Sequence, residues 1–251
     1  MELSAFFEAH PRLALAFSGG ADSSYLLYEG LRQAERLGVY YLKSPFQPEF
    51  ERRDALRLAS ELGAEVTVLE ADPLSDPRVA ASPANRCYYC KKVIMSTIQA
   101  AAKKDGFDLL IDGTNASDDI ADRPGFQALA ETGVLSPLRL CGITKPEVRA
   151  RSREAGLFTW NKPAYACLAT RIPTGEEITA EKLTRVEKSE DALFRMGFTD
   201  FRVRTRGSCA KLQFTAEQHG EAARRMDEIK AALLPYFSEI TLDPIPREKS
   251  L

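Results

Sequence analysis

One short stretch constrains the fold of this chain more than any other, the sequence "AFSGGADSSYLL" from Ala16 to Leu27. Strand-forming residues from Leu13 to Phe17 lead into it and apolar residues at helical spacing follow it, which predicts a strand-to-helix junction. Two glycines allow a tight turn and a close approach of the backbone to a ligand. A helix start offers free N–H groups and a positive dipole end, and the serines add donors. The stretch is therefore predicted to bind phosphate.

The order of apolar patterns predicts the fold class. Four strand-like runs, "RLALAF", "VYYL", "AEVTVLE" and "FDLLID", alternate with helical patterns at residues 23–37, 48–62 and 91–104. Strands separated by helices predict an α/β fold, a parallel sheet flanked by helices on both faces. Ligands of such sheets bind at the carboxyl ends of strands. A second loop, "DGTNASDD" from Asp112 to Asp119, follows the run "FDLLI" and is expected at the same edge as the first loop.

The alternation of strand-like and helical segments ends at about Leu157. Residues 158–178 show neither the helical nor the strand period of apolar residues. We interpret them as an active-site loop and linker between a domain of residues 1–157 and a smaller one of residues 179–251. The last part contains helical patterns at 180–196 and 217–234 and strand-like runs "DFRVRT", "AKLQF" and "FSEITL". These predict a C-terminal α+β domain that binds substrate.

Composition narrows the class of protein. Of 251 residues, 44% are hydrophobic and 28% charged, which excludes a mostly disordered chain. A net charge of -2 argues against a large sequence-independent grip on nucleic acid. No apolar run has membrane-spanning length, and the N-terminal segment resembles no export signal. We expect a cytoplasmic protein with no stable nucleic-acid partner and no membrane.

Five cysteines, an odd number, argue against a disulfide framework. Cys87 and Cys90 form a C-x-x-C that fits a redox pair, half of a zinc site, part of an iron–sulfur site or two buried thiols. Cys167 lies in "KPAYACLATR", between a lysine and an arginine that would stabilise a thiolate. Together the three would leave one iron of a cluster open, whereas Cys141 and Cys209 read as small apolar residues.

The loop lacks the lysine of a Walker-type phosphate loop. Its pattern S-G-G-x-D-S resembles instead the pyrophosphate loop (PP-loop) of the ATP pyrophosphatase superfamily, whose members cleave ATP between the α and β phosphates and leave AMP on a substrate oxygen. The alternative is a glycine turn that only caps a helix. The resemblance implies that Asp22 acts in catalysis and helps hold magnesium. It also implies a set of residues that hold phosphate, namely Ser18, Gly19, Gly20, Ser23 and Ser24.

The second loop is rich in oxygen ligands. Its polar residues, with an arginine beyond, are Asp112, Thr114, Asn115, Asp118, Asp119, Asp122 and Arg123. A solvated acidic turn is the alternative, but the expected place at the sheet edge favours nucleotide and magnesium. We predict that Gly113, Thr114 and Asn115 bind the nucleotide and that Asp119 shares the magnesium with Asp22.

Longer motifs identify a narrower family. "GTN…DD…RPG", "SPL…GITKPEVRA", "TWNKPA-ACLATRIPTG-EIT-EKL-RVE-SE" and "GF-DFRVR" resemble the LarE family of ATP-dependent sulfur transferases, which build the nickel-pincer nucleotide of lactate racemase. The resemblance runs from about Leu13 to about Phe214. It implies a pyridinium dicarboxylate mononucleotide as substrate: the enzyme adenylates a carboxylate, sulfur displaces AMP, and repetition yields the bis-thiocarboxylate.

The resemblance implies one of two roles for the cysteines in supplying sulfur. In members with one cysteine matching Cys167, that residue gives up its sulfur and becomes dehydroalanine. Other members also have the C-x-x-C, and three cysteines hold a [4Fe-4S] cluster that carries an extra sulfide. Cys87 and Cys90 favour the second type, with ATP, Mg²⁺ and a [4Fe-4S] cluster as cofactors. The resemblance also implies a homo-oligomer that works with nickel-pincer pathway enzymes upstream and downstream.

Arginines alternate on the strand "FRVRTRG". A solvated edge strand is the ordinary interpretation. The resemblance implies instead that Arg202 and Arg204 bind the substrate phosphate, a task suited to a guanidinium fork, with Arg171 and Glu190 completing the site. Trp160 fits either the core or a stacking role.

The chain departs from the family pattern at Asn161, Thr170 and Thr174, where we expect aspartate, serine and tyrosine, and these changes affect the finer substrate contacts. Three other functions compete. A tRNA-thiolating enzyme would need a basic surface or RNA-binding domain. The others are a zinc-stabilised nucleotide-binding module without catalysis, and an amide-forming ligase, which would need an ammonia source.

Overall fold

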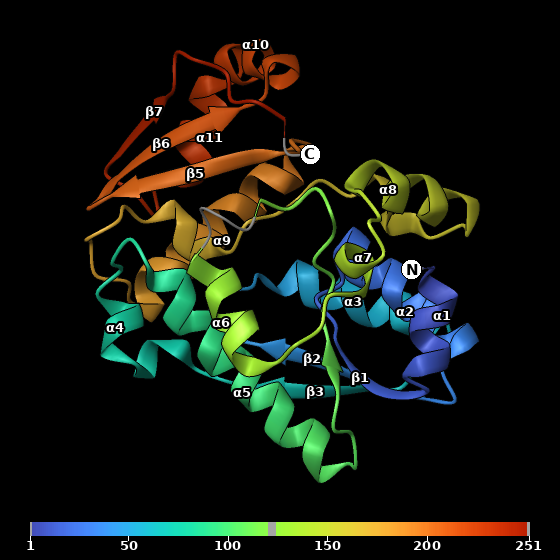
Figure 1. The fold of residues 1–251 in the computed structure, drawn as a ribbon. Helices are drawn as coiled ribbons and strands as arrows, with labels where there is room; N and C mark the ends of the chain where they lie inside the picture. The colour runs from blue at the N-terminus through green and yellow to red at the C-terminus, as the bar shows by residue number, and fades with distance from the viewer. Residues whose placement is uncertain (1, 120–123, 250–251) are drawn as a thin grey trace. The chain divides into compact units, whose positions relative to one another are not determined.

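The computed structural model describes residues 2–119 and 124–249 and divides the chain into two compact units (Figure 1). The first unit comprises Met1–Val79 and Asn85–Lys162, and the second comprises Ala80–Ala84 and Pro163–Leu251. The second unit's main segment thus begins within the predicted linker of residues 158–178. In the part of the chain that the structure describes, no helix is long and apolar enough to cross a membrane.

A four-stranded sheet forms the centre of the first unit. Its strands, in the spatial order β3-β2-β1-β4, are β1 (Arg12–Ala16), β2 (Arg36–Lys43), β3 (Val66–Glu70) and β4 (Leu110–Ile111). All three pairings are parallel. The helices before Pro163 are α1 (Leu3–Ala9), α2 (Ala21–Gln33), α3 (Glu49–Glu61), α4 (Pro77–Ala80), α5 (Arg86–Lys104), α6 (Pro124–Thr132), α7 (Pro137–Leu140) and α8 (Lys145–Glu154). The predicted α/β fold with a parallel sheet is confirmed.

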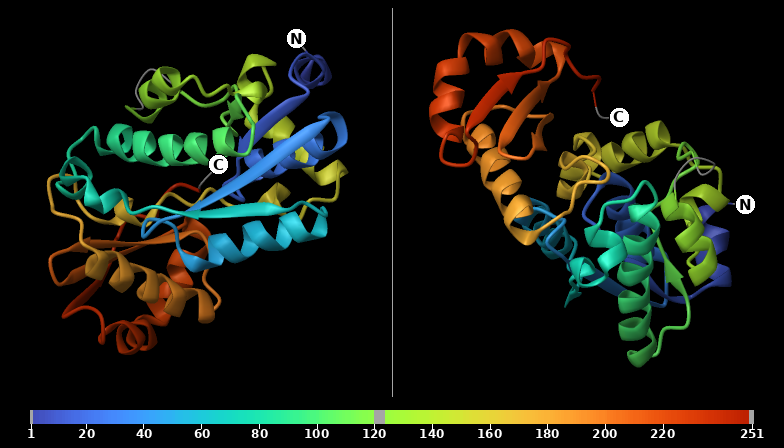
Figure 2. Two further views of the ribbon diagram at one scale, coloured as in Figure 1. Left: turned by 90° about the horizontal axis from the view of Figure 1, so that it is seen from below. Right: turned by 90° about the vertical axis from the view of Figure 1, so that its left-hand side faces the viewer.

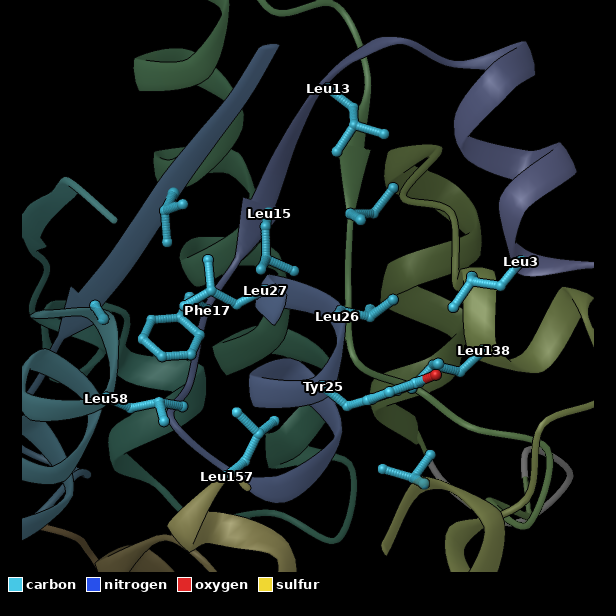
Figure 3. Close-up of a cluster of buried hydrophobic side chains, with 14 of the residues drawn as sticks. Leu3, Leu13, Leu15, Phe17, Tyr25, Leu26, Leu27, Leu58, Leu138 and Leu157 are labelled. Atoms are coloured by element: carbon cyan, nitrogen blue, oxygen red, sulfur yellow. The ribbon is translucent and has the colours of Figure 1, made fainter. Parts of the chain in front are cut away.

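Helices cover both faces of this sheet because successive residues of a strand point to opposite sides. Leu13, Leu15 and Phe17 pack on the side of Leu26 and Leu27 from α2 (Figure 3). The residues between them belong to the opposite core, with side chains from α5 and α6. Figure 2 shows α5 on one face of the sheet and α3 on the other. Burial on both faces explains the nearly continuous apolar sequence of β1.

The second unit has its own small sheet and core. Strands β5 (Phe201–Arg206), β6 (Cys209–Phe214) and β7 (Glu239–Leu242) lie side by side, β5 antiparallel and β7 parallel to β6. The helices are α9 (Ala180–Arg195), α10 (Ala216–Arg224) and α11 (Met226–Leu233). Phe198, Phe201 and Phe214 are fully buried in this core. The smaller mixed sheet with helices matches the predicted α+β region.

Three predicted helices have different limits in the structure. The helix expected to reach Leu37 ends at Gln33, because Leu37 pairs with Leu13 in the sheet. The helix expected from Lys91 already begins at Arg86, since Cys87, Tyr88 and Tyr89 of its first turn are not buried and form no apolar period. The helix expected over 217–234 divides at Arg225, whose backbone leaves the helical region between α10 and α11.

Candidate active site

The S-G-G loop lies at the carboxyl end of β1, where the sequence predicts a ligand site. Gly19 has φ +74°, and a Cβ there would lie 2.6 Å from the Cβ of Ala55 on α3, so only glycine fits. Ser23 Oγ donates to the Gly20 carbonyl at 3.2 Å and lies 3.0 Å from Ser18 Oγ. These two hydroxyls therefore shape the loop itself.

The start of α2 faces this loop without a side-chain cap. Gly20 is the N-cap residue, and none of the described side chains accepts a hydrogen bond there as a cap. The hydroxyl of Ser24 is fully buried and, among the described residues, has no hydrogen-bond partner. First-turn N–H groups that lack an internal acceptor and a positive dipole end favour an anion at this position.

The second predicted loop meets the first. A Cβ on Gly113 would lie 2.8 Å from the backbone nitrogen of Ser23, so the two loops touch through glycine. Asn115 Nδ2 donates to Asp22 Oδ1 at 3.3 Å. Thr114 Oγ1 donates to the buried Asp112 carboxylate at 2.8 Å, which ties the loop to the end of β4. The expected meeting of both loops at one sheet edge is present.

Lys145 completes this group, and our sequence reasoning did not single it out. Its Nζ lies 2.6 Å from Asp22 Oδ2. Lys145 is the first residue of α8, which begins with a capping box in which Thr144 and Glu147 bond each other. The T-x-x-E pattern and a proline at the second position could have predicted this helix start, but not which loop the lysine reaches.

Burial changes the acidity of the Asp22 carboxyl. It raises the pKa of this carboxyl above its ordinary value, Lys145 opposes that effect through its charge and hydrogen bond, and the charge of Asp118 adds to the rise. Asp118 also accepts a hydrogen bond from the Asn115 backbone at 3.0 Å, whereas Asp119 is exposed. The predicted positions Asp122 and Arg123 lie outside the described residues.

The C-x-x-C lies on the first turn of α5 in the first unit. Cys87 is exposed and Cys90 partly exposed, and their spacing places them on one side of the helix. Arg86 Nη2 lies 3.6 Å from Cys87 Sγ. Within residues 2–119 and 124–249, no three His, Cys, Asp or Glu side chains gather closely enough to hold a metal ion. The third predicted ligand, Cys167, belongs to the second unit.

Two other cysteines and the tryptophan have ordinary surroundings. Cys141 packs against the first unit's core, and burial raises the pKa of its thiol. Cys209 lies 3.4 Å from a carboxylate oxygen of Glu239 in the second unit. The Trp160 ring is contacted by the guanidinium of Arg153, 5.1 Å from the ring centroid.

Cys167 lies beside a buried ion pair in the second unit. It precedes a short 3-10 turn, Leu168–Arg171, and is partly exposed. Arg171 binds Glu190 through two hydrogen bonds of 2.8 and 3.0 Å, and both side chains are almost fully buried. Tyr165, which our sequence reasoning did not single out, donates its hydroxyl to the same carboxylate.

The predicted phosphate-binding arginines share one side of β5 but differ in exposure. Arg202 is buried, and its pKa falls to about 10 because of burial and the positive charges of Arg171 and Arg247. Its Nη2 donates to the Ala164 carbonyl at 3.0 Å. Arg204 is exposed and donates to Gln213 Oε1 at 3.1 Å. Of the two, Arg204 therefore has the guanidinium that a ligand can approach.

Known proteins resemble this chain over most of its length. It is 32% identical over 235 residues to pyridinium-3,5-bisthiocarboxylic acid mononucleotide synthase of Lactiplantibacillus plantarum, covering 92% of this chain and 85% of that protein. It is 39% identical over 220 residues to an uncharacterized protein of Synechocystis sp., covering 86% and 81%. A third relative, an uncharacterized protein of Methanocaldococcus jannaschii, is 29% identical over 182 residues, covering 72% and 69%. No protein-family model matches the chain.

Proposed function

Because the chain belongs to the LarE family, that of pyridinium-3,5-bisthiocarboxylic acid mononucleotide synthase, we propose that it converts carboxylates of a pyridinium mononucleotide into thiocarboxylates. The observation that carries this proposal is identity of 32% across 92% of the chain, which includes both units. We propose further that ATP activates each carboxylate as an acyl adenylate, releasing pyrophosphate. A carboxylate is a poor electrophile, and AMP is a leaving group that a sulfur nucleophile can displace.

The first unit supplies the groups that this use of ATP requires. The uncapped start of α2 and the ammonium of Lys145 converge beside the S-G-G loop, and both favour phosphate oxygens. Lys145 would thus supply the positive charge that a Walker-type loop carries within its own sequence. Asp22 holds this ammonium at 2.6 Å, which orients it before the nucleotide binds.

Magnesium fits this site through carboxylate oxygens. Asp22 would hold it, with Asp119 as the second predicted ligand, and Asp118 is the carboxylate whose charge acts on Asp22. When bound, the ion would neutralise phosphate charge. Because Lys145 and Asn115 already contact the two oxygens of Asp22, the ion would share or replace one of these contacts.

The sulfur would pass through the cysteines. Cys87 and Cys90 offer two sulfur ligands on one side of α5, and Cys167 offers a third from the second unit. We propose that these three hold a [4Fe-4S] cluster, which would carry the sulfide that attacks the acyl adenylate. Arg204, exposed on β5, is then the first candidate for the phosphate of the substrate, and the buried Arg202 is the second.

The reaction itself tests the proposal. The anaerobically reconstituted chain is incubated with ATP, magnesium and the pyridinium dicarboxylate mononucleotide, and product mass, AMP and pyrophosphate are measured. We expect one sulfur-for-oxygen exchange per carboxylate, with one AMP and one pyrophosphate for each exchange. Sulfur insertion without ATP use, or ATP use without sulfur insertion, would contradict it.

The polypeptide mass after turnover identifies the sulfur source. An unchanged mass agrees with transfer through a cluster. A chain lighter by the elements of hydrogen sulfide, with the loss mapped to Cys167, would show instead that this cysteine is consumed and that the C-x-x-C has another role.

A further inference from the structure

The segment that carries Cys167 has little regular structure of its own. Residues 162–167 belong to no helix or strand, and the next turn, Leu168–Arg171, is short. Carbonyl groups of such a segment need other donors. In the second unit two of these donors are guanidinium groups: Arg202 Nη2 reaches the Ala164 carbonyl at 3.0 Å, and Arg171 Nη1 reaches the Ala166 carbonyl at 2.8 Å. The Cys167 carbonyl accepts the backbone N–H of Thr170 at 2.9 Å and its hydroxyl at 2.8 Å, so it is the residues before Cys167 that side chains hold.

One of these arginines, Arg171, is itself held by a buried carboxylate. Glu190 on α9 receives two hydrogen bonds from Arg171, and its Oε1 also accepts the backbone N–H of Val203 on β5 at 2.9 Å. The Glu190 side chain is 2% exposed and that of Arg171 0%. A buried carboxylate with several charge-assisted bonds has little freedom to move. The Arg171–Glu190 pair is therefore a fixed support for the segment that carries Cys167.

Tyr165 links the segment to this base. Its hydroxyl donates to Glu190 Oε2, and its ring is contacted by two guanidiniums, with the Cζ of Arg171 at 4.6 Å and that of Arg202 at 5.5 Å from the centroid. Tyr165 precedes Cys167 by two residues, and Arg171 is close enough to Cys167 for their charges to interact. The tyrosine thus adds a side-chain contact to the two arginine contacts that hold the residues just before Cys167.

We propose that Tyr165 is a positioning residue that holds Cys167 in place by anchoring residues 163–167 to the buried Arg171–Glu190 pair. The proposal rests on the proposed function for the use of Cys167 in sulfur transfer. The anchoring itself is a property of the second unit. The arginines hold the carbonyls of Ala164 and Ala166, and the tyrosine hydroxyl adds a third fixed point between these two residues.

Peptide-resolved alkylation of the full-length chain before cluster reconstitution tests this proposal. Tyr165→Phe removes only the hydroxyl, and Cys209 in the same unit is an internal reference. We expect the ratio of the Cys167 rate to the Cys209 rate to rise by about fivefold or more, as loss of a hydrogen bond to a charged group predicts. Tyr236→Phe, which removes the hydroxyl of a partly buried tyrosine elsewhere in the unit, should leave the ratio unchanged.

A ratio that Tyr165→Phe leaves unchanged would overturn the proposal, and so would an equal rise at Cys167 and Cys209, which would indicate general loosening. Arg204→Gln removes the donor to the Thr170 carbonyl and should raise the ratio in the same direction. If only Arg204→Gln changes it, Tyr165 is not the anchor. The assay needs neither ATP nor nucleotide substrate, so its result does not depend on whether the chain transfers sulfur.

Discussion

Single side chains in the first unit carry more of the candidate chemistry than the S-G-G loop alone. The loop hydroxyls of Ser18 and Ser23 bond each other, and Ser24 is buried. The positive charge comes instead from Lys145, far away in the sequence, whose ammonium lies 2.6 Å from the Asp22 carboxylate. Removal of one partner of such a partly buried pair also disturbs the other.

Lys145→Gln tests the role of this charge. If Lys145 binds phosphate oxygens, the variant loses charge stabilisation where negative charge develops, and we expect kcat/KM for ATP to fall by about 10²-fold. Pyrophosphate release in the presence of substrate measures it. Lys104→Gln, at the exposed end of α5, is the matched control and should behave as wild type. Equal activity of both variants would remove Lys145 from the nucleotide site.

Adjacent tyrosines on β2 should respond in opposite ways to loss of the hydroxyl. Tyr41 is 2% exposed, and its hydroxyl has no hydrogen-bond partner among the described residues, so Tyr41→Phe should stabilise the chain by about 1 kcal/mol. The Tyr40 hydroxyl donates to Asp105 at 2.7 Å, so Tyr40→Phe should destabilise by about 1–2 kcal/mol. Urea unfolding at neutral pH measures both, and effects of the same sign would refute this assignment.

The same tyrosines predict how stability depends on alkaline pH. Burial raises the pKa of each above its ordinary value, and negative charge from Asp105 near Tyr40 and from Glu51 near Tyr41 adds to it. The folded chain therefore keeps these protons above about pH 10, where the unfolded chain loses them, so the free energy of unfolding falls as pH rises. Tyr41→Phe should make this fall shallower. An unchanged slope would contradict the prediction.

Glycines allow whole elements to approach at the candidate site. Gly19 brings the β1–α2 loop against α3, and Gly113 brings the loop after β4 against the start of α2. Both loops follow β1 and β4, which pair in parallel at the point where the chain order of the sheet reverses. That is the position at which open α/β sheets bind ligands.

Gly19→Ala and Gly63→Ala separate close packing from backbone strain. Both glycines have positive φ, but a Cβ on Gly63 meets nothing within 4 Å, whereas one on Gly19 meets Ala55. We expect Gly63→Ala to cost about 1 kcal/mol of stability from strain, and Gly19→Ala to cost a further 1–3 kcal/mol or so from overpacking. Only Gly19→Ala should slow pyrophosphate release, because it displaces the loop. Similar costs at both positions would show that packing against α3 is unimportant.

Across the whole molecule the candidate chemistry is divided between two units. The first contains the S-G-G loop, Lys145 and the C-x-x-C, and the second contains Cys167 with its buried ion pair. Each unit has a separate hydrophobic core. A reaction that uses ATP and Cys167 together therefore needs both.

Iron and acid-labile sulfide after anaerobic reconstitution test whether the cysteines of both units share a cluster. We expect about four irons per wild-type chain, as a [4Fe-4S] cluster requires. Cys90→Ala removes a ligand of the first unit and Cys167→Ala removes a ligand of the second, so each variant should lose most of this iron. Cys141→Ala, at the edge of the first core, is the control and should retain it. Iron that survives in Cys167→Ala would limit the site to the first unit.

The pattern of apolar residues along the sequence was enough to predict the main helices and strands of both units. The parallel sheet, the loop at the end of β1 and the α+β character of the second unit follow from apolar periodicity and from glycine and serine at one junction. The predicted end of α2 was wrong because Leu37 pairs with a strand, and the predicted start of α5 was wrong because the Cys and Tyr side chains of its first turn are not buried and form no apolar period. The role of Tyr165 was missed because no residue near it in the sequence indicates that its hydroxyl contacts Glu190.

The sequence by itself determined the fold class, the family and the residue types available for chemistry, because periodicity and motif spacing are properties of neighbouring residues along the chain. Only the tertiary structure decided that Lys145 meets Asp22, that Arg202 is buried while Arg204 is exposed, and that Tyr165 reaches Glu190. These contacts join residues from 25 to 123 positions apart. Which partners meet over such separations depends on how helices and strands pack, since burial selects among many pairings of similar local chemistry.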